Sequence, residues 1–448
     1  MFTPINPATG EAGTPIPELT ADQVEERLAR ADTAFRDWRT SDLATRSALL
    51  HAIADQFEMS KPRLAEIATR EMGKTLKSAI AEVEKCVAGF RYYADNGAAM
   101  LAPQPFDGGT AHWMPLGPVL AVMPWNFPYW QVIRFVAPTI MAGNVGLLKH
   151  ASLTQGCGAA IEEMVLAAGA PDGLFQNLAI TSGAVDALIA DPRIAAVTLT
   201  GSEDAGAKVA ATAGKNLKKV LLELGGSDPF IVMPSADLDA AVQAAVTARI
   251  QNTGQSCICG KRMIVHTAIY DAFMERFTAA MRAVKAGDPT RPDTDRGPLS
   301  STDQRDTVVE QLKAIQAAGG RLLLGGESLP GPGAYMSAGV MVDVPIDSPA
   351  AQEEVFGPVA MVFRADDIGS AIALANAIPF GLGSSVWTND AHEREVFVRD
   401  LEAGMVAVNK MLASTPEAPF GGIKRSGHGR ELGPYGLHEF MNLKAVIG

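Results

Sequence analysis

The chain has 448 residues, of which 47% are hydrophobic and 20% charged, so it is long enough for two or three domains with large buried cores. Its formal net charge is -12 and no segment is rich in lysine and arginine, which makes nucleic acids and anionic membranes poor candidates as partners. Four cysteines in a chain of this length do not form a disulfide scaffold.

The first residues, MFTPINPATGEAG, contain no basic segment followed by an apolar one, so we expect no secretory signal. No stretch approaches the roughly 18 consecutive apolar residues of a membrane span, and we expect a cytoplasmic protein. Helices are predicted over 20–38 and 41–57, where apolar residues recur at spacings of three and four behind a Thr or Ser that can cap the start. The segment 101–118, rich in Pro and Gly, separates this helical start from the rest.

Short runs of Val, Ile and Leu then alternate with Ala-rich helical segments. Strands are predicted at 119–125, 143–149, 175–180, 195–201 and 219–226. The pattern restarts after Asp237 with a helix over 238–250, and further strands are predicted at 262–270, 321–326, 359–365, 383–388 and 404–409. This alternation predicts an α/β fold with two parallel sheets, each covered by helices on both faces, and a break near 225–230.

The segment LTGSEDAG (199–206) places Gly201, Ser202 and Gly206 between a predicted strand and a predicted helix. Such a turn lets backbone N–H groups approach a phosphate at the start of the helix. An ordinary strand–helix turn with a capping Ser explains the pattern equally well.

Two polar side chains stand in apolar surroundings. Glu223 lies inside an apolar strand before two glycines, where it is either a general base with a raised pKa or an edge residue that reaches solvent. Asn126 lies between two prolines and among aromatic residues. It is either a rigid hydrogen-bond donor to an oxyanion or the cap of an aromatic turn.

The segment QNTGQSCICG (251–260) contains Cys257 and Cys259, one residue apart. A structural zinc site needs about four ligands, and no second Cys/His pair has suitable spacing. A disulfide between residues this close is strained. The residues alone leave two alternatives, a packing role or one reactive thiol.

Together these segments resemble the aldehyde dehydrogenase superfamily. The matching pieces occur in the family's order and cover nearly the whole chain: PWNFP (124–128), LLKHAS (147–152), LTGSEDAG (199–206), LELGGSDPF (222–230), NTGQSC (252–257), EEVFGPV (353–359) and APFGGIKRSGHGRE (418–431). Order and spacing of seven motifs are far more specific than any single motif.

The resemblance implies that the Cys257 thiolate attacks an aldehyde and that the Asn126 amide and the Cys257 backbone N–H hold the resulting oxyanion. Glu223 would then activate the water that hydrolyses the thioester. Two alternatives are an enzyme that transfers the acyl group to coenzyme A and a non-catalytic nucleotide-binding protein. The presence of Glu223 disfavours the first, because hydrolysis would compete with transfer. The intact set of Cys257, Glu223 and Asn126 disfavours the second. Cys259 is expected to be a packing residue or a redox partner that protects Cys257.

The resemblance also implies a nicotinamide cofactor, NAD or NADP, across the carboxyl ends of the first sheet's strands. The expected cofactor-binding residues are Trp125, Lys149, Ser152, Gly201, Ser202, Gly206, Leu224, Glu354 and Phe356. Strictly NAD-dependent members often carry Glu where this chain has Ser152, and that Glu repels a 2′-phosphate. We therefore expect both cofactors to be accepted, with a slight preference for NAD. No metal site is expected.

Within the family, the chain is similar to the short bacterial type of succinate semialdehyde dehydrogenase. Arg134 and Ser414 match positions that would bind the substrate's carboxylate, and this role is favoured for Arg134 over the alternative of a carboxylate partner at a subunit contact. Gln251 replaces an Arg that many of these enzymes carry, which suggests weaker selectivity. A glutarate semialdehyde dehydrogenase or a broad-specificity aliphatic enzyme is the alternative.

The resemblance implies three domains and a homodimer or homotetramer. The cofactor-binding domain would comprise 1–100 and 116–226, and the catalytic domain 227–432. Segments 101–115 and 433–448 would form a small β oligomerisation domain, whose strands pair between subunits.

Overall fold

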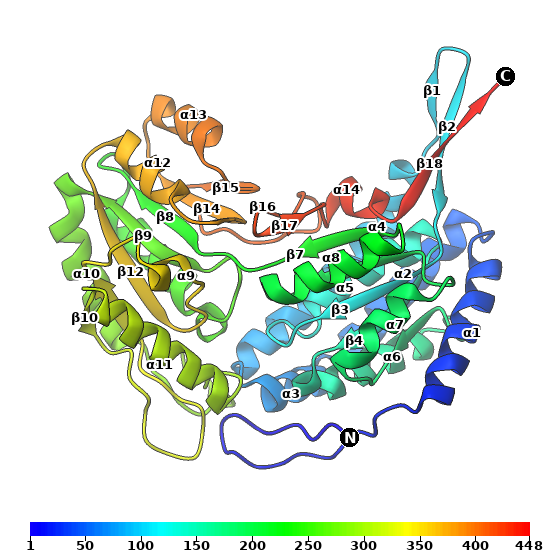
Figure 1. Cartoon of the computed structure of the whole chain (residues 1–448), viewed down its shortest axis with the longest axis horizontal. Helices are drawn as coiled ribbons and strands as arrows, with labels where there is room; N and C mark the ends of the chain where they lie inside the picture. The colour runs from blue at the N-terminus through cyan, green and yellow to red at the C-terminus, as the bar shows by residue number, and fades with distance from the viewer.

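The computed structural model describes residues 1–448 and arranges them in two α/β lobes and a small projecting sheet (Figure 1). Four helices form most of the first hundred residues: α1 (Ala21–Trp38), α2 (Leu43–Met59), α3 (Lys61–Met72) and α4 (Leu76–Met100). Helix α1 begins with a capping box, in which the Thr20 hydroxyl accepts from the backbone N–H of Gln23. None of the helices is both long enough and apolar enough to cross a membrane.

The first large sheet has the order β17-β7-β6-β3-β4-β5, with all pairs parallel except β17 with β7. Its strands are β3 (Pro118–Met123), β4 (Val145–His150), β5 (Phe175–Asn177), β6 (Ala196–Thr200), β7 (Lys219–Glu223) and β17 (Gly427–His428). Between them lie α5 (Trp130–Ala142), η1 (Ser152–Thr154), α6 (Gln155–Ala167), η2 (Ser182–Ala184), α7 (Val185–Ala190) and α8 (Glu203–Lys215). The chain therefore builds outward in both directions from β3, as in dinucleotide-binding folds.

The second large sheet has the order β10-β11-β12-β9-β8-β14-β15, with only the β10 edge antiparallel. Its strands are β8 (Asp228–Val232), β9 (Gly260–His266), β10 (Arg321–Leu324), β11 (Gly339–Val342), β12 (Val359–Ala365), β14 (Gly383–Trp387) and β15 (Met405–Val408). Its helices are α9 (Leu238–Ile250), η3 (Gln251–Gly254), η4 (Thr267–Ile269), α10 (Tyr270–Ala283), α11 (Thr302–Ala317), η5 (Pro349–Gln352), α12 (Ile368–Asn376) and α13 (Ala391–Asp400).

Apolar cores cover both faces of this second sheet. Along β8, Phe230 and Val232 belong to one core and Ile231 to the other, because successive side chains of a strand point to opposite faces. The prediction of two parallel sheets, each buried on both faces, is confirmed for this sheet by its two cores. Strands β8 and β11 were not predicted separately, because each is a short apolar run next to a Gly-containing segment.

The small sheet joins β1 (Gln104–Phe106), β2 (Gly109–Pro115) and β18 (Met441–Ile447) in antiparallel order and projects from the first lobe (Figure 1). It is preceded in the chain by α14 (Gly433–His438). The remaining pair, β13 (Phe380–Gly381) with β16 (Ile423–Lys424), forms a separate two-stranded antiparallel sheet. Strand β17 belongs to the first sheet, although it falls within the 227–432 range.

A fully buried ion pair connects α4 to the turn before α5. Lys74 pairs with Glu82, and both side chains are almost inaccessible to water. The other oxygen of Glu82 accepts hydrogen bonds from the backbone N–H groups of Tyr129 (2.8 Å) and Trp130 (2.9 Å). The Lys74 ammonium also lies 4.3 Å from the centre of the Phe127 ring. This pair therefore fixes the turn that follows Asn126.

We predict that Lys74→Met destabilises the protein by about 3–5 kcal/mol, because it leaves the Glu82 carboxylate buried without its cation. Chemical denaturation of wild type and variant measures the difference. The control is Lys61→Met, which removes ion pairs to the exposed Glu58 and Glu84 and should leave the free energy of unfolding nearly unchanged. Equal stabilities for the two variants would contradict this account of the turn.

Candidate functional site

A cavity of about 290 Å³ opens at the carboxyl ends of β3, β6 and β7. In sheets of this order, ligands bind where the chain switches direction, and here that point lies between β3 and β6. Six predicted cofactor-binding residues line the cavity: Trp125, Gly201, Ser202, Leu224, Glu354 and Phe356. Asn126 and Cys257 line it too. The edge of the first sheet thus brings together segments that are far apart in the chain, from Pro124 to Phe356.

The start of helix α8 forms part of this wall. The Ser202 hydroxyl caps the helix by accepting from the N–H of Ala205 (3.4 Å). Gly206 does not line the cavity. A side chain at Gly206 would lie only 2.6 Å from Leu224 Cδ2, so this glycine leaves room for Leu224, which does line the cavity. Gly206 therefore acts on the cavity through Leu224.

Lys149 lies near the end of strand β4, just before His150, and Ser152 begins η1; both lie outside the lining of this cavity. The Lys149 side chain is buried (8% exposed) and has no carboxylate within ion-pair distance, and its burial lowers the pKa of the ammonium. Ser152 is exposed at the start of η1. A buried cation without a partner beside an exposed hydroxyl provides room and charge for an anionic group.

The loop that carries Cys257 has an unusual backbone. Asn252 (φ 51°), Thr253 (φ 57°) and Gly254 (φ 77°) are three consecutive left-handed residues. For the β-branched Thr253 this conformation is strained, and strain of this kind persists only where the surroundings enforce it. At Gly254 a side chain would lie 2.4 Å from the backbone of Gly357, so only glycine fits there.

Hydrogen bonds hold this loop from several directions. The Asn252 amide donates to the carbonyls of Asn126 (2.7 Å) and Gln255 (3.0 Å), and the Asn126 amide donates to Gln255 as well (3.1 Å). The buried Gln255 side chain accepts from the N–H of Ser300 (2.9 Å). The nucleophile loop and the Asn126 turn are therefore fixed to each other.

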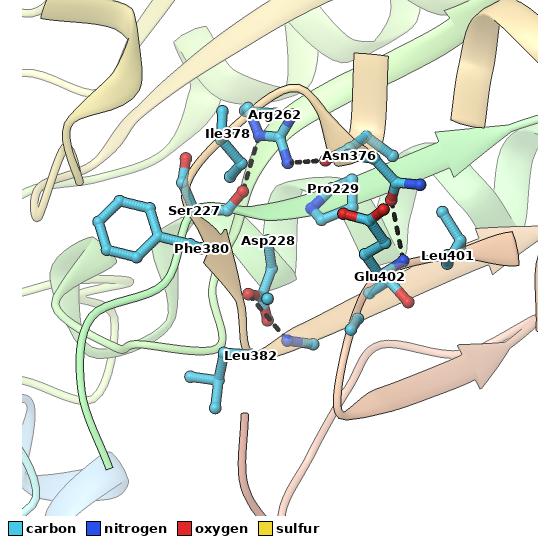
Figure 2. Close-up of a pocket in the computed structure, with 15 residues that line it drawn as sticks. Ser227, Asp228, Pro229, Arg262, Asn376, Ile378, Phe380, Leu382, Leu401 and Glu402 are labelled. Atoms are coloured by element: carbon cyan, nitrogen blue, oxygen red, sulfur yellow. Dashed lines mark hydrogen bonds between the residues drawn. The ribbon is translucent and has the colours of Figure 1, made fainter. Parts of the chain in front are cut away.

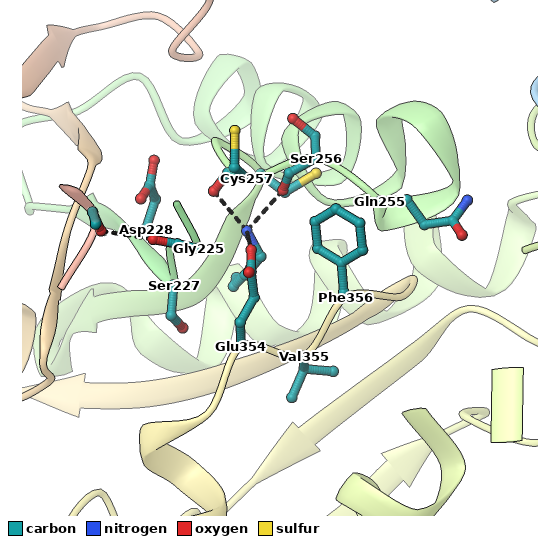
Figure 3. Close-up of polar contacts among 12 residues, drawn as sticks. Gly225, Ser227, Asp228, Gln255, Ser256, Cys257, Glu354, Val355 and Phe356 are labelled. Carbon is teal, nitrogen blue, oxygen red and sulfur yellow. Dashed lines mark hydrogen bonds and ion pairs between the residues drawn. The ribbon is translucent and has the colours of Figure 1, made fainter. Parts of the chain in front are cut away.

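Lys261, at the start of β9, holds the same loop through hydrogen bonds to its backbone carbonyls. Its ammonium donates to the carbonyls of Ser256 (2.8 Å) and Cys257 (2.7 Å) and lies 3.0 Å from Glu354. Figure 3 shows these contacts converging between the nucleophile loop and Glu354. One buried cation thus connects the predicted nucleophile to the carboxylate that was predicted to bind the nicotinamide ribose.

Burial raises the pKa of the Cys257 thiol to about 12, while the positive charges of Arg134 and Lys261 act in the opposite direction. The thiol is therefore protonated at neutral pH in this state. The backbone N–H of Cys257 has no hydrogen-bond partner in the chain, and the Asn126 amide uses one of its two N–H donors. Both N–H groups that were predicted to hold an oxyanion are available.

Glu223 ends β7, and neither of its buried carboxylate oxygens has a hydrogen-bond partner. Burial raises the pKa of Glu223 well above its usual value, and the nearby Glu431 carboxylate adds to this rise, while Arg134 and Arg430 oppose it. Glu223 does not line the cavity that Asn126 and Cys257 share. Its side chain lies beside Gly421, where an added Cβ would be 2.7 Å from Glu223 Oε1.

A second, smaller cavity of about 80 Å³ meets the first at Cys257. The three predicted substrate-binding residues line it: Arg134, Gln251 and Ser414. Lys85 also lines it, which was not predicted from the sequence. Only Cys257 and Gln131 line both cavities. A reactant attached to the Cys257 sulfur would therefore have access to both spaces.

Arg134 is held by the protein itself. It forms a buried ion pair with Glu431, donates to the Thr200 hydroxyl (3.1 Å) and lies over the Phe420 ring (4.6 Å). The alternative of a carboxylate partner for Arg134 is thus realised within one chain rather than at a subunit contact. Glu431 lies in the segment APFGGIKRSGHGRE, which carried the family resemblance without a role for this residue.

Cys259 is fully buried, and its thiol faces the backbone carbonyls of Arg249 and Gln251. A further cavity, beside Asp228 and Arg262 on the second sheet, measures only about 10 Å³, which is room for about one water (Figure 2). There Asp228 accepts from the N–H of Gly383 (3.1 Å), and Arg262 donates to the carbonyl of Ser227 (2.7 Å). These contacts join strands of the second sheet and lie outside the two cavities at Cys257.

Comparisons with known proteins agree with this geometry. The model of the aldehyde dehydrogenase family matches residues 1–446. The chain is 52% identical to succinate-semialdehyde dehydrogenase [NADP(+)] 1 of Mycobacterium tuberculosis, over 99% of this chain and 98% of that protein. It is 52% identical to succinate-semialdehyde dehydrogenase [NADP(+)] of Mycolicibacterium paratuberculosis, over 99% of this chain and 95% of that protein.

Among solved structures, the crystal structure of succinic semialdehyde dehydrogenase from Streptococcus pyogenes in complex with NADP+ superimposes with a TM-score of 0.97. It is 38% identical and covers 100% of this chain and 99% of its own. The fold predicted from the sequence, two parallel-sheet α/β domains of this family's type, is confirmed by this match.

We predict that Lys261→Met slows alkylation of Cys257 by iodoacetamide, because it removes a positive charge that favours the thiolate. At a pH below the pKa of the thiol, each unit by which that pKa rises should lower the alkylation rate about tenfold, because the thiolate fraction falls by that factor. The rate is measured as a function of pH by peptide mapping. The control is Lys410→Met, an exposed lysine without a salt-bridge partner. Unchanged alkylation in the Lys261 variant would show that this cation does not act on the sulfur.

Proposed function

The chain belongs to the aldehyde dehydrogenase family, and we propose that it oxidises succinate semialdehyde to succinate with NADP+ as the preferred cofactor. The single observation that supports this most is the position of Cys257 between two cavities. One cavity lies at the cofactor-binding edge of the first sheet, and the other is small and lined by cationic side chains. An aldehyde bound to the sulfur from one side could be oxidised from the other.

The residues present fit a nicotinamide dinucleotide. The cavity lies at the switch point of the sheet, the capped start of α8 forms one wall, and the unpaired Lys149 ammonium lies at the end of the adjacent strand. When bound, the cofactor accepts a hydride. Lys149, Ser202 and Glu354 would hold it, and Trp125 and Phe356, whose rings meet edge to face at 5.7 Å, would bound the site.

Cys257 is the proposed nucleophile. The Cys257 thiol first gives up its proton to water. The thiolate then attacks the aldehyde carbon, and the negative charge moves to the carbonyl oxygen of the resulting thiohemiacetal. The free N–H of the Asn126 amide and the backbone N–H of Cys257 are the donors for this oxyanion. Because the loop and the Asn126 turn are hydrogen-bonded to each other, these donors keep their geometry as the charge develops. Loss of hydride leaves a thioester on the sulfur.

Glu223 is the proposed general base for hydrolysis of that thioester. A carboxylate with a raised pKa is a stronger base than an ordinary Glu, and its oxygens have no competing hydrogen-bond donors. Glu223 takes a proton from water, the hydroxide attacks the thioester carbon, and the carboxylic acid leaves while the thiol is restored. A side-chain movement from the Gly421 side toward Cys257 would bring the base to the water.

The proposed substrate rests on the small cavity and on the relatives. The chain is 52% identical to enzymes named succinate-semialdehyde dehydrogenase over nearly its full length. A cavity of about 80 Å³ is much smaller than a drug-sized site of roughly 300–1,000 Å³ and suits a short aldehyde. Its cationic lining favours an aldehyde with a carboxylate. Glutarate semialdehyde and unbranched aliphatic aldehydes are expected to be poorer substrates.

The preference for NADP replaces the slight preference for NAD expected from the sequence. The named relatives carry NADP(+) in their names, and the matched solved structure contains NADP+. In this chain the exposed Ser152 leaves space for a 2′-phosphate, and Lys149 supplies an unpaired positive charge. Both features are compatible with NAD as well, which is therefore the expected second cofactor.

A homodimer or homotetramer in the cytoplasm is proposed as the working form. The small sheet projects from the first lobe, and its strand β18 has exposed apolar side chains at Leu443 (45% exposed), Val446 (51%) and Ile447 (81%) (Figure 1). Exposed apolar edge strands favour pairing with a second copy. The mass of the purified protein in solution tests this proposal.

Steady-state kinetics with a panel of aldehydes test the proposed function. We predict the highest kcat/KM for succinate semialdehyde with NADP+, a lower value with NAD+, and lower values for glutarate semialdehyde and butyraldehyde. Formation of reduced cofactor and of the acid are measured together, with coenzyme A present or absent. A preference for butyraldehyde over both semialdehydes would refute the proposed substrate, and a thioester product with coenzyme A would refute hydrolysis.

We predict that Glu223→Gln produces a rapid burst of about one equivalent of reduced cofactor and then turns over about 10²–10⁴-fold more slowly. The thioester forms, but the water is no longer activated. In the wild type, hydrolysis requires deprotonated Glu223, so it should speed up as the pH rises toward the raised pKa and slow down as the pH falls. The Gln variant should lack this dependence.

The matched control is Glu275→Gln, which alters an exposed carboxylate on α10. It should behave as the wild type in both phases. Loss of the burst itself in Glu223→Gln would mean that Glu223 acts before hydride loss and not as the hydrolytic base.

A further inference from the structure

Lys85, on helix α4, places an ammonium group against the small cavity beside Cys257. Its Nζ donates to the Ser414 hydroxyl (2.7 Å) and lies 4.5 Å from the centre of the Trp130 ring. Trp130 Nε1 donates to the same Ser414 oxygen (2.9 Å). The lysine head group is thus held in one place by two side chains from other parts of the chain.

No carboxylate of the protein neutralises this ammonium. Lys85 forms no ion pair, and the acidic residue one turn earlier, Glu82, is already occupied by Lys74 and by the N–H groups of Tyr129 and Trp130. An ammonium has three donors, and only one has a partner in the chain. A partly buried cation with unused donors, facing a cavity, is suited to bind an anion.

Arg134 is the other cation of this cavity, but its charge is already balanced. The ion pair with Glu431, the hydrogen bond to Thr200 and the stacking on Phe420 fix its guanidinium. Because the charges of Arg134 and Glu431 cancel, the net positive charge of the cavity comes from Lys85. Binding a carboxylate at Arg134 alone would place it near Glu431, which repels it.

We propose that Lys85 binds the carboxylate of the substrate, together with the Ser414 hydroxyl, and thereby selects carboxylated aldehydes over neutral ones. The proposal rests on the proposed function, because it names the residue that recognises the semialdehyde at the site where Cys257 reacts. In this arrangement Arg134 does not bind the substrate's carboxylate but neutralises Glu431, which would otherwise repel it. Lys85 is a specificity-determining residue rather than a catalytic one, since the neutral end of any aldehyde reaches Cys257 without it.

The surroundings of Lys85 add a second observable. Burial lowers the pKa of Lys85 to about 8, and the positive charge of Arg134 acts in the same direction, while Glu82, Cys86 and Cys257 oppose it. The free enzyme therefore loses this positive charge as the pH rises through about 8. The KM for a carboxylated aldehyde should rise over that range, and the KM for butyraldehyde should not follow it.

The test compares Lys85→Met with wild type on succinate semialdehyde and on butyraldehyde. Loss of a charge-assisted hydrogen bond should raise the KM for succinate semialdehyde about tenfold or more, with a smaller change in kcat. The kcat/KM for butyraldehyde should fall by less than about threefold. Lys85→Arg, which keeps the charge, should recover part of the affinity. The KM of Lys85→Met should also lose its rise above pH 8.

Lys77→Met is the matched control, because Lys77 is an exposed lysine on the same helix. It should leave both substrates unaffected. Binding of succinate, measured by calorimetry, should weaken in Lys85→Met and remain in Lys77→Met. An equal loss on both aldehydes, or no loss on either, would overturn the proposal. If the wild type itself prefers butyraldehyde, the proposed function fails, and that result is distinct from any outcome for the variant.

Discussion

Hydrogen bonds from Asn252, Asn126 and Lys261 to backbone carbonyls hold the loop 252–257 in a conformation that its sequence does not favour. Three consecutive left-handed residues, one of them a Thr, are strained, so the loop depends on these contacts. The contacts come from both lobes: Asn126 follows β3 of the first sheet, and Lys261 begins β9 of the second. The position of the Cys257 sulfur therefore depends on how the two lobes pack against each other.

The charges around this sulfur form a second level of organisation. Three cations lie near it, Lys85, Arg134 and Lys261, and each has different partners. Lys261 supports the loop and pairs with Glu354, Arg134 pairs with Glu431, and Lys85 has no anionic partner in the chain. Because Glu431 also raises the pKa of Glu223, the Arg134–Glu431 pair connects the substrate cavity to the proposed hydrolytic base.

Much of the fold and of the candidate site could be predicted from the sequence, for different reasons. Alternation of apolar strands and Ala-rich helices predicts two parallel sheets, and the ordered motifs indicate Cys257, Asn126 and Glu223 as candidates for the site. Local pattern carries no information about which side chains meet across hundreds of residues. In the sequence Lys85 is an ordinary lysine of a helix, and only its hydrogen bond to Ser414, 329 residues later, shows its position at the small cavity.

The same limit applies to Arg134 and Gly206. The sequence marks Arg134 as a cation on an apolar helix, but its partner Glu431 is distant in the chain. Gly206 is predicted near the phosphates from its place in a turn, and the structure adds that it makes room for Leu224. In both cases the sequence indicates that the residue type matters, but it does not show which residue it contacts. Packing between distant segments decides what each polar group does.

The most direct test of the account is to find where an aldehyde becomes covalently attached. The purified enzyme is incubated with succinate semialdehyde and NADP+, quenched in acid and mapped by peptide mass spectrometry. If Cys257 is the nucleophile, an acyl group is expected on its sulfur and none on the buried Cys259. An adduct on another cysteine, or turnover with no adduct at any cysteine under conditions that trap thioesters, would contradict it.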